Sequence, residues 1–438
     1  MNGTFVREHH GGFTRWDTDV TPFVRPGKKN EIRLEVTDRL DDISYASGYA
    51  HHPIGGILRD VTLFALPETC LYDFYAETHL DAAYEDAVLK IGYSSPVVGG
   101  AEVAYTLADP SGRRYPLAQS RFPLKEGGNM NELPVKNPLK WDAEHPNLYT
   151  LTVTLSKDGK EIGRFDRRIG FRDVKIEKDR MLVNGMPVKL RGACRHDIHP
   201  TLVTRRSSSS RKSIFKRSNM NFVRTSHYPP TERFLEYCDR YGIYVESETA
   251  VCFVDTYRQK NYAPGKTQDS AGFTPRYLSQ CREMVKSFRS HPSILFWSIG
   301  NESVYGTNFQ QCWDWVKATD KTRPVIFSYP GSVGEKEPVY DILSMHYQDV
   351  NGNLNQWNRS TRGFQGEGIP ALFDEWAHPA CYTYATLQED PNIREFWGHS
   401  IERMWSGLFD APGGLGGAIW GYVDETFMLP EPKVGTAF

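Results

Sequence analysis

This sequence lacks a long apolar run and a large excess of charge of either sign, and each absence excludes a class of protein. No apolar run is long enough to cross a bilayer as a helix, so we expect neither a membrane protein nor a membrane partner. Acidic and basic residues are nearly balanced, because 54 Asp and Glu face 52 Lys and Arg, a formal net charge of −2. This balance gives no reason to expect nucleic acid as a partner.

Cysteine is scarce, and its spacing is irregular. The seven cysteines among the 438 residues show no paired spacing, which argues against a disulfide framework and against a zinc site. We expect no cofactor. The N-terminus has no basic region followed by an apolar segment, so no signal peptide is visible, and a cytoplasmic, a periplasmic and a secreted location all stay open.

What the sequence does contain begins with a β-rich half. At residues 30–36 and 61–64 apolar and polar residues alternate, which predicts strands. Residues 1–66 are few for a closed sandwich, which would bury both inner faces. We therefore expect this region to be part of a domain that is truncated at its N-terminal side.

Residues 67–173 predict a second all-β unit, with short alternating runs at the spacing of a sandwich. The clearest strand is expected at residues 149–155, and the Asp158-Gly159 pair after it is a hairpin turn signal.

From residue 174 onward, short strands alternate with helical stretches, the pattern of a parallel α/β domain. Helices are expected at residues 231–241, 275–289 and 308–319. Eight strands in about 250 residues are typical of a (β/α)8 TIM barrel. The eight are expected at residues 188–191, 222–225, 244–247, 294–298, 325–327, 342–345, 371–374 and 417–420. The chain stops soon after the eighth, so we expect a barrel that is incomplete at its C-terminal end.

Two of these strands lead to a glutamate. Glu302 follows the fourth predicted strand, and Glu375 ends the seventh. Parallel barrel strands deliver catalytic groups to one mouth of the barrel, so these two side chains are expected there together. Two carboxylates on different strands of one barrel suggest cleavage of a glycosidic bond.

A series of motifs spread over the whole chain resembles glycoside hydrolase family 2. The motifs lie at residues 55–61, 141–149, 169–172, 183–185, 195–197, 224–229 and 300–302, in the order that the family has them. The resemblance implies a sugar-binding jelly-roll sandwich, of which residues 1–66 are the C-terminal part, an immunoglobulin-like sandwich at 67–173 and a catalytic TIM barrel at 174–438. Members of this family are retaining exo-β-glycosidases, mainly β-galactosidases, β-glucuronidases and β-mannosidases.

The resemblance also implies roles for individual residues. Glu302 is the expected general acid/base, and Glu375 is the expected nucleophile of a glycosyl-enzyme intermediate. Asn301 is expected to hydrogen-bond the sugar 2-hydroxyl. A retaining enzyme needs its two carboxyl groups about 5–5.5 Å apart.

The remaining expected site residues surround a sugar bound against Glu375. The expected substrate-binding residues are His196, His227, Asn301, Tyr347, His378 and Trp420, and Arg224 is the expected supporting cation. A structural interpretation stays open for several of them: loop polarity for the histidines, a structural ion pair for Arg224, and core packing for Tyr347 and Trp420.

One departure from the family concerns metal. Some large β-galactosidases carry a glutamate and a histidine beyond the third strand that hold magnesium. The matching positions here are Cys252 and Val254, neither of which is a magnesium ligand. We therefore expect no catalytic metal.

The expected function is hydrolysis of a terminal β-linked sugar, most of all a β-galactoside, from an oligosaccharide or glycoside. A β-glucuronidase would need the family's Asn-x-Lys signature for the sugar carboxylate, which is absent. A β-mannosidase, a carbohydrate-binding protein without catalysis, and a gene fragment that does not fold also stay open.

A homo-oligomer is compatible with the sequence. The serine-rich basic segment at 205–212 is expected to be a surface loop.

Overall fold

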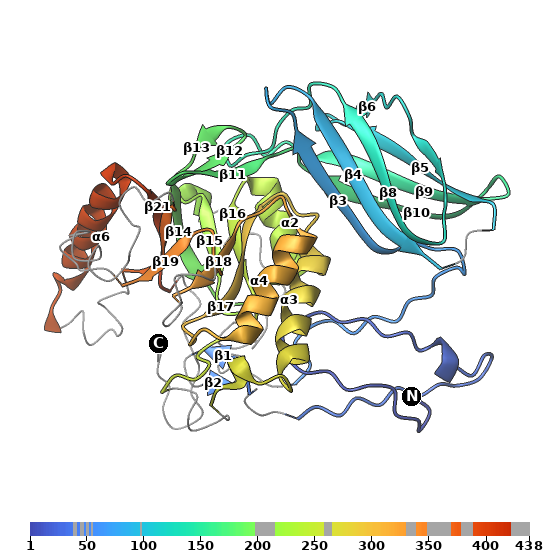
Figure 1. Ribbon diagram of the computed structural model, residues 1–438, viewed down its shortest axis with the longest axis horizontal. Helices are drawn as coiled ribbons and strands as arrows, with labels where there is room; N and C mark the ends of the chain where they lie inside the picture. The colour runs from blue at the N-terminus through green and yellow to red at the C-terminus, as the bar shows by residue number, and fades with distance from the viewer. Residues whose placement is uncertain are drawn as a thin grey trace.

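A β-sandwich, a barrel and an N-terminal segment make up the protein in a computed structural model (Figure 1). The structure describes residues 1–37, 42–43, 48–49, 52–53, 56–96, 99–197, 215–257, 265–329, 339–347, 369–377 and 389–421. Among these residues, no helix has the length and apolar character needed to cross a membrane.

The sandwich consists of two antiparallel sheets with a common core. One sheet has the order β3 (Tyr72–Leu80), β4 (Ala87–Ser95) and β8 (Gly127–Val135). The other runs from β10 (Lys160–Ile169) through β9 (Tyr149–Lys157) and β5 (Ala101–Ala108) to β6 (Arg114–Tyr115), and β7 (Arg121–Pro123) also pairs with β5.

Strand β9 shows why this region folds as a sandwich. Its side chains alternate, so that Leu151, Val153 and Leu155 are buried in the core between the sheets, as the period of a strand requires. The predicted hairpin turn is confirmed: Asp158 and Gly159 both have positive φ, +49° and +76°, the conformation that joins two twisted antiparallel strands.

The barrel is an eight-stranded parallel sheet, and all eight predicted strands are present. The strands are β14 (Leu190–Arg195), β15 (Phe222–Thr225), β16 (Tyr244–Glu248), β17 (Ile294–Asn301), β18 (Val325–Ser328), β19 (Leu343–His346), β20 (Ala371–Trp376) and β21 (Gly414–Ile419). They pair in the order β18-β17-β16-β15-β14-β21-β20-β19. A bridge between Ile326 and Ile342 joins the two ends of this order, so the sheet closes on itself.

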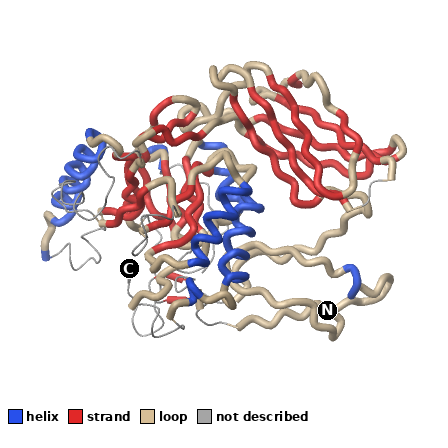
Figure 2. The backbone as a smooth tube through the Cα atoms, in the orientation of Figure 1, coloured by secondary structure: helices blue, strands red, loops and turns tan. Residues whose placement is uncertain are grey.

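Helices α2 (Glu232–Tyr241), α3 (Thr274–Phe288) and α4 (Thr307–Thr319) cover one side of the barrel (Figure 2). Their buried residues share one core with the outward-facing side chains of strands β15 to β18. Helix α2 ends at Gly242, whose φ of +65° is easily adopted by glycine. The three helices begin and end within one residue of the predicted positions. Helix α6 (Ile393–Asp410) packs beside β21.

Short elements complete the described chain. A small antiparallel sheet is formed by β11 (Val174–Glu177), β12 (Arg180–Val183) and β13 (Met186–Pro187), and β1 (Gly48–Tyr49) pairs with β2 (His52–Pro53). The 3-10 turns are η1 (Thr21–Phe23) and η2 (Thr267–Asp269).

The prediction of strands at residues 30–36 and 61–64 is wrong. Within the described part of residues 1–66, only β1 and β2 are strands. An alternating segment becomes a strand only where a neighbour pairs with its backbone, and these segments have no such neighbour among the described residues. Their apolar side chains are therefore exposed, for example Ile32 at 49% and Leu63 at 70%.

The N-terminal segment nevertheless packs against the barrel. Gln280 on α3 donates to the backbone oxygen of His10 at 2.8 Å and accepts from Thr14. Nearby, the ring of Phe13 stacks on Tyr228, with ring centroids 3.6 Å apart. These contacts hold the segment beside helix α3 and the loop that follows β15.

Arg172 connects the sandwich to the barrel. This arginine follows β10, is 4% exposed, and donates to the backbone oxygens of Pro292 at 2.6 Å and of Ile294 at 2.7 Å. Ile294 is the first residue of β17 and Pro292 lies just before it, so the contact fixes the sandwich to the strand that leads to Glu302.

Replacing Arg172 with Ala should therefore destabilise the protein. The change leaves the buried carbonyl oxygen of Pro292 without its charged donor, whereas Ile294 O keeps a second donor, Arg323 Nε at 2.8 Å. An unpaired buried acceptor costs about 1–3 kcal/mol. The measurement is the free energy of unfolding in urea. Arg168→Ala, at a position of β10 that is not buried, is the matched control and should change it little. Equal stability of the two variants would contradict the role given to Arg172.

Candidate active site

Arg224 stands at the centre of the barrel mouth and is completely buried. Its guanidinium nitrogens approach four carboxyl groups: Glu375 at 2.7 Å, Glu248 at 2.8 Å, Glu246 at 3.4 Å and Asp374 at 3.8 Å. Burial alone would lower the pKa of Arg224, but the charges of Glu248, Glu375 and Asp374 outweigh it and raise the pKa well above its usual value. The guanidinium is therefore a permanent cation.

Glu375 is held by a donor on each of its two carboxylate oxygens. Arg224 Nη1 donates to Oε1 at 2.7 Å, and the hydroxyl of Tyr347 donates to Oε2 at 2.8 Å. Burial and the charge of Glu375 raise the pKa of Tyr347, so this hydroxyl keeps its proton. The nucleophile position predicted from the sequence is thus fixed in orientation.

The strands that lead to the two glutamates each depart from regular pairing near their ends. Relative to their neighbours, β17 shifts register within residues 298–301 and β20 within residues 373–376. A bulge of this kind changes the alternation of a strand and re-aims its side chains. This is why the consecutive residues Asp374 and Glu375 both reach Arg224.

Glu302 continues directly from β17 with a φ of +37°, a left-handed conformation that is uncommon for a residue with a side chain. Its backbone N–H donates to Ser328 O at 2.9 Å. Tyr329 and Tyr347, which follow β18 and β19, also have positive φ, +44° and +46°. Backbone strain of this kind is common at functional sites. Here it occurs directly after three successive strands, β17, β18 and β19.

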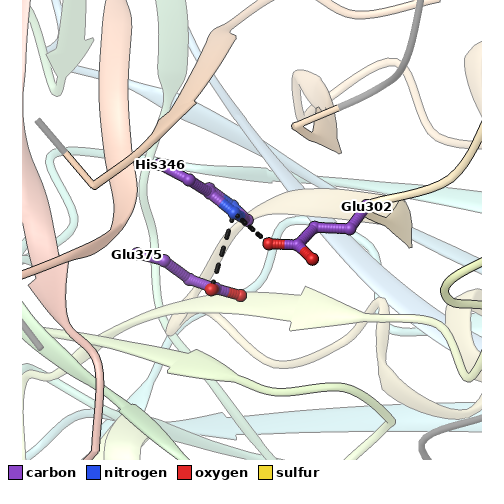
Figure 3. Close-up of side chains that lie close together, drawn as sticks. All are labelled: Glu302, His346 and Glu375. Carbon is purple, nitrogen blue, oxygen red and sulfur yellow. Dashed lines mark hydrogen bonds and ion pairs between the residues drawn. The ribbon is translucent and has the colours of Figure 1, made fainter. Parts of the chain in front are cut away.

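The two glutamates face each other across His346, the last residue of β19 (Figure 3). Glu302 Oε1 lies 2.9 Å from His346 Nδ1, and Glu375 Oε2 lies 3.5 Å from the same nitrogen. One oxygen of each carboxyl group and the imidazole nitrogen all lie within 4.8 Å of one another. The side chain of Glu302 is 24% exposed, whereas that of Glu375 is 3% exposed.

Asn301 is oriented by two donors to its amide oxygen. Arg224 Nη2 donates to Oδ1 at 2.8 Å, and Ser328 Oγ donates to the same oxygen at 3.1 Å. The amide nitrogen is buried, and it has no hydrogen-bond partner among the described residues. A buried donor without a partner is costly in a folded protein.

Two of the predicted histidines form an aromatic wall with Trp420. His227 stacks on Trp420 with ring centroids 5.2 Å apart, and His196 meets the same ring edge-on at 5.3 Å. Glu248 fixes His227, since its Oε1 lies 2.8 Å from Nδ1. Burial and the neighbouring cationic groups lower the pKa of His196 well below its usual value, so this ring is neutral.

The structure therefore brings most of the predicted site residues together. Arg224 contacts both Asn301 and Glu375 directly, Tyr347 contacts Glu375, and Glu302 is linked to Glu375 through His346. The adjoining aromatic wall is formed by His196, His227 and Trp420. Two predictions fall outside the described residues: His378 and the serine-rich segment at 205–212.

Sequence reasoning missed four polar residues of the site, namely Glu246, Glu248, His346 and Asp374. A signal was present for the first two, because two carboxylates at alternate positions of a strand as buried as β16 need a partner inside the barrel. Asp374 and His346 each precede a predicted site residue, and strict alternation of a strand would have pointed them away.

Within the part of the chain that the structure describes, the group of side chains that could present ligand atoms to a cation is Glu302, His346 and Glu375. All three belong to the site just described. Cys252 and Val254, the two residues from which we expected no catalytic metal, are completely buried. The absence of a catalytic metal stays a prediction.

Glu246 lies next to Arg224 and has an unusual environment. It is completely buried, and neither carboxyl oxygen has a hydrogen-bond partner among the described residues. Burial and the negative charge of Asp374 raise its pKa well above 4.5, although the nearby Arg224 acts in the opposite direction. Glu246 is therefore a neutral acid in the folded protein at moderately acidic pH.

This pKa gives the stability of the protein a defined dependence on pH. Because the folded-state pKa of Glu246 lies above the unfolded value of 4.5, the stability linked to its proton is complete below that value and is lost as pH rises towards the folded-state pKa. The loss is about 1.4 kcal/mol for each pH unit in this window. Glu246→Gln removes the titration, so the variant should gain stability over the parent between pH 5 and pH 8, by on the order of 1 kcal/mol or more.

Urea unfolding of both proteins at the two pH values measures this difference. Glu126→Gln, which removes an exposed carboxyl group, is the control and should follow the parent at both pH values. A Glu246→Gln variant whose stability runs parallel to that of the parent would contradict the raised pKa.

Two family models match the chain. The family model described as "Glycosyl hydrolases family 2, TIM barrel domain" matches residues 174–403, and "Glycosyl hydrolases family 2" matches residues 69–172. The chain is 33% identical to a β-galactosidase of Priestia megaterium over 458 residues, which cover all of this chain and 42% of that protein. It is 29% identical to a β-galactosidase of Vibrio vulnificus over 452 residues, 97% of this chain and 41% of that protein.

The fold is also similar to solved structures. A β-glucuronidase of Parabacteroides merdae superimposes with a TM-score of 0.77 at 21% identity, covering 96% of this chain and 57% of that one. The β-D-glucuronidase of Dictyoglomus thermophilum gives 0.76 at 21% identity, covering 99% and 80%. The chain spans about two fifths of the length of the curated relatives it matches. The closed barrel and the two glutamates at its mouth are compatible with that family. Because the TIM barrel model matches more than half of its residues, the chain belongs to glycosyl hydrolase family 2.

Proposed function

We propose that the protein hydrolyses β-glycosides with retention, through a covalent glycosyl-enzyme intermediate. The observation that carries this proposal is the spacing of the two glutamates, whose nearest ligand oxygens lie within 4.8 Å. Retaining enzymes keep their carboxyl groups about 5–5.5 Å apart, whereas inverting enzymes need about 6.5–9.5 Å to admit a water molecule. The spacing supports the first class.

In the first step, Glu375 attacks the anomeric carbon and the glycosidic bond breaks. Arg224 and Tyr347 hold the attacking carboxylate by their hydrogen bonds at 2.7 and 2.8 Å, so little reorganisation is required. Glu302 gives a proton to the leaving oxygen, because an alkoxide is a poor leaving group in water. In the second step the same group removes a proton from water, which attacks the intermediate and frees Glu375.

The unpartnered amide nitrogen of Asn301 supports a role in binding the sugar. A substrate hydroxyl would provide the acceptor that this buried donor lacks, and a contact to the 2-hydroxyl strengthens as positive charge develops at the anomeric carbon. Trp420 and His227 present stacked rings next to Glu375, since His227 Nε2 lies 3.8 Å from Glu375 Oε1. Apolar faces of a sugar ring pack well on such rings.

Among possible sugars, we propose a β-galactoside. The curated relatives at about 30% identity are β-galactosidases, whereas the β-glucuronidase neighbours share this fold at 21% identity. A glucuronate carboxylate also needs a cation of its own. Arg224 is already surrounded by protein carboxylates, so it does not supply that cation. A panel of nitrophenyl glycosides tests the choice of sugar directly.

Substitution of the two glutamates should affect turnover in different ways. Glu375→Gln removes the nucleophile and should abolish turnover of every substrate. Glu302→Ala removes the proton donor, so its kcat/KM should fall on the order of 10²-fold or more for phenyl β-galactoside. It should fall much less for 2,4-dinitrophenyl β-galactoside, whose leaving group needs no proton. Steady-state kinetics with the two substrates measures the difference.

Glu126→Gln serves again as an exposed control and should keep parental rates. Normal turnover by Glu375→Gln would contradict the proposed mechanism. A parent protein that binds galactosides but turns over no member of the panel would instead favour a carbohydrate-binding protein without catalysis. Absence of a cooperative melting transition would favour a fragment that does not fold.

A further inference from the structure

His346 is the group that lies between the two glutamates, and its protons can be placed from its hydrogen bonds. On one side, Nδ1 lies 2.9 Å from Glu302 Oε1 (Figure 3). On the other side, Nε2 lies 3.1 Å from Ser328 Oγ. The imidazole is 4% exposed, and the ring of Tyr329 stacks on it at a centroid distance of 4.8 Å. It is therefore held in one orientation.

Ser328 determines the proton on Nε2. Its hydroxyl proton goes to one of two groups that can only accept, the carboxylate of Asp374 or Asn301 Oδ1, which lies 3.1 Å away. That atom is the oxygen rather than the nitrogen of the amide, because the cationic Arg224 also donates to it, at 2.8 Å. The oxygen of Ser328 must then accept from His346, so Nε2 carries a hydrogen atom.

With Nε2 protonated, the 2.9 Å contact on the other side of the ring contains one further proton. If this proton is on Nδ1, the pair is an imidazolium and a carboxylate. If it is on Glu302, the pair is a neutral imidazole and a carboxylic acid. Both arrangements give a good hydrogen bond at this distance. The pair therefore titrates as one unit.

The surrounding charges favour retention of that proton. Burial alone would lower the pKa of His346, but the charges of Glu375 and Asp374, together with hydrogen bonds to Asp374 and Glu302, raise it to about 10. The charged or titratable groups that face the imidazole are Glu302 after β17, Asp374 and Glu375 on β20, Glu246 on β16 and Tyr347 after β19, with Arg224 on β15 behind the carboxylates. Glu246 is neutral and Tyr347 keeps its proton, so carboxylates dominate this environment.

We propose that His346 is a positioning residue that stores the proton which Glu302 delivers to the leaving oxygen. This inference rests on the proposed function, because it assumes that Glu302 is the acid/base of a double displacement. It adds that the general acid is the pair formed by His346 and Glu302, rather than Glu302 alone.

The proton balance of the pair follows the two chemical steps. In the first, the stored proton moves from Nδ1 to the carboxylate of Glu302 and from there to the leaving oxygen, while Glu375 forms its bond to the anomeric carbon. The pair has then lost the stored proton, so that His346 is a neutral imidazole and Glu302 is a carboxylate. In the second, Glu302 takes a proton from the attacking water, the bond to Glu375 breaks, and the proton returns to Nδ1. No further reactant is needed.

The test is the pH profile of His346→Asn. Asparagine places an amide nitrogen near the position of Nδ1, so it can still donate to Glu302 but cannot release a proton. The basic limb of kcat/KM for phenyl β-galactoside should move to lower pH in this variant. At pH 8 the loss should be on the order of 10²-fold, and at pH 5 it should be small. For 2,4-dinitrophenyl β-galactoside both pH values should show little loss.

His291→Asn is the matched control, because His291 is also a buried histidine paired with a carboxylate, Asp239, at 2.6 Å, but lies before β17 rather than at its catalytic end. It should lower the melting temperature without moving the basic limb. An unmoved limb in His346→Asn, or an equal loss on both substrates, would overturn the proposal.

The parent enzyme decides the matter if His346→Asn does not fold. A basic limb well above pH 7 for phenyl β-galactoside supports the pair, and a limb below about pH 7, where a single catalytic carboxyl group titrates, contradicts it. Failure of the proposed function would be seen separately, as an inactive parent or an active Glu375→Gln variant.

Discussion

The buried guanidinium of Arg224 is the interaction on which the barrel mouth depends. It is a permanent cation at hydrogen-bond distance from both Glu248 and Glu375, and Asn301 takes its orientation from the same group. Removal of one partner from a buried ion network leaves the others uncompensated, typically at a cost of about 3–5 kcal/mol. Arg224 thus holds together strands β15, β16, β17 and β20, and with them Glu375, the proposed nucleophile, and Asn301, the residue proposed to contact the sugar.

A second consequence of this network is the separation of protonation states. Carboxyl groups outnumber the cations around Arg224 and His346. The excess of negative charge is reduced at the buried carboxyl group that lacks hydrogen bonds among the described residues, because Glu246 is kept neutral by its raised pKa. Asp374 shows the opposite behaviour: burial would raise its pKa, but the charge and hydrogen bond of His346 outweigh burial and lower it. Neighbouring acids therefore have different charges, as acid/base catalysis requires.

The sequence predicted the part of this site that depends on repeating patterns. The eight barrel strands follow from short apolar runs between helical stretches, and Glu302 and Glu375 could be placed because each comes where such a run ends. Two of the missed residues, His346 and Asp374, depend on departures from a pattern, whereas Glu246 and Glu248 alternate regularly on β16. Bulges in β17 and β20 change which side chains face inward, and no simple alternation predicts where such a bulge falls. The error at residues 30–36 has a related cause, because alternation shows that a strand is possible but not that a partner is present.

The central claim is that Glu375 forms a covalent bond to the sugar. The most direct measurement is mass spectrometry of the protein after incubation with 2,4-dinitrophenyl 2-deoxy-2-fluoro-β-galactoside, in which fluorine slows both steps and the activated leaving group favours the first. The account predicts that the protein gains the mass of one fluorosugar and that the peptide containing Glu375 carries it. A label on the peptide containing Glu302, or turnover of ordinary substrates by a protein that never acquires the label, would contradict it.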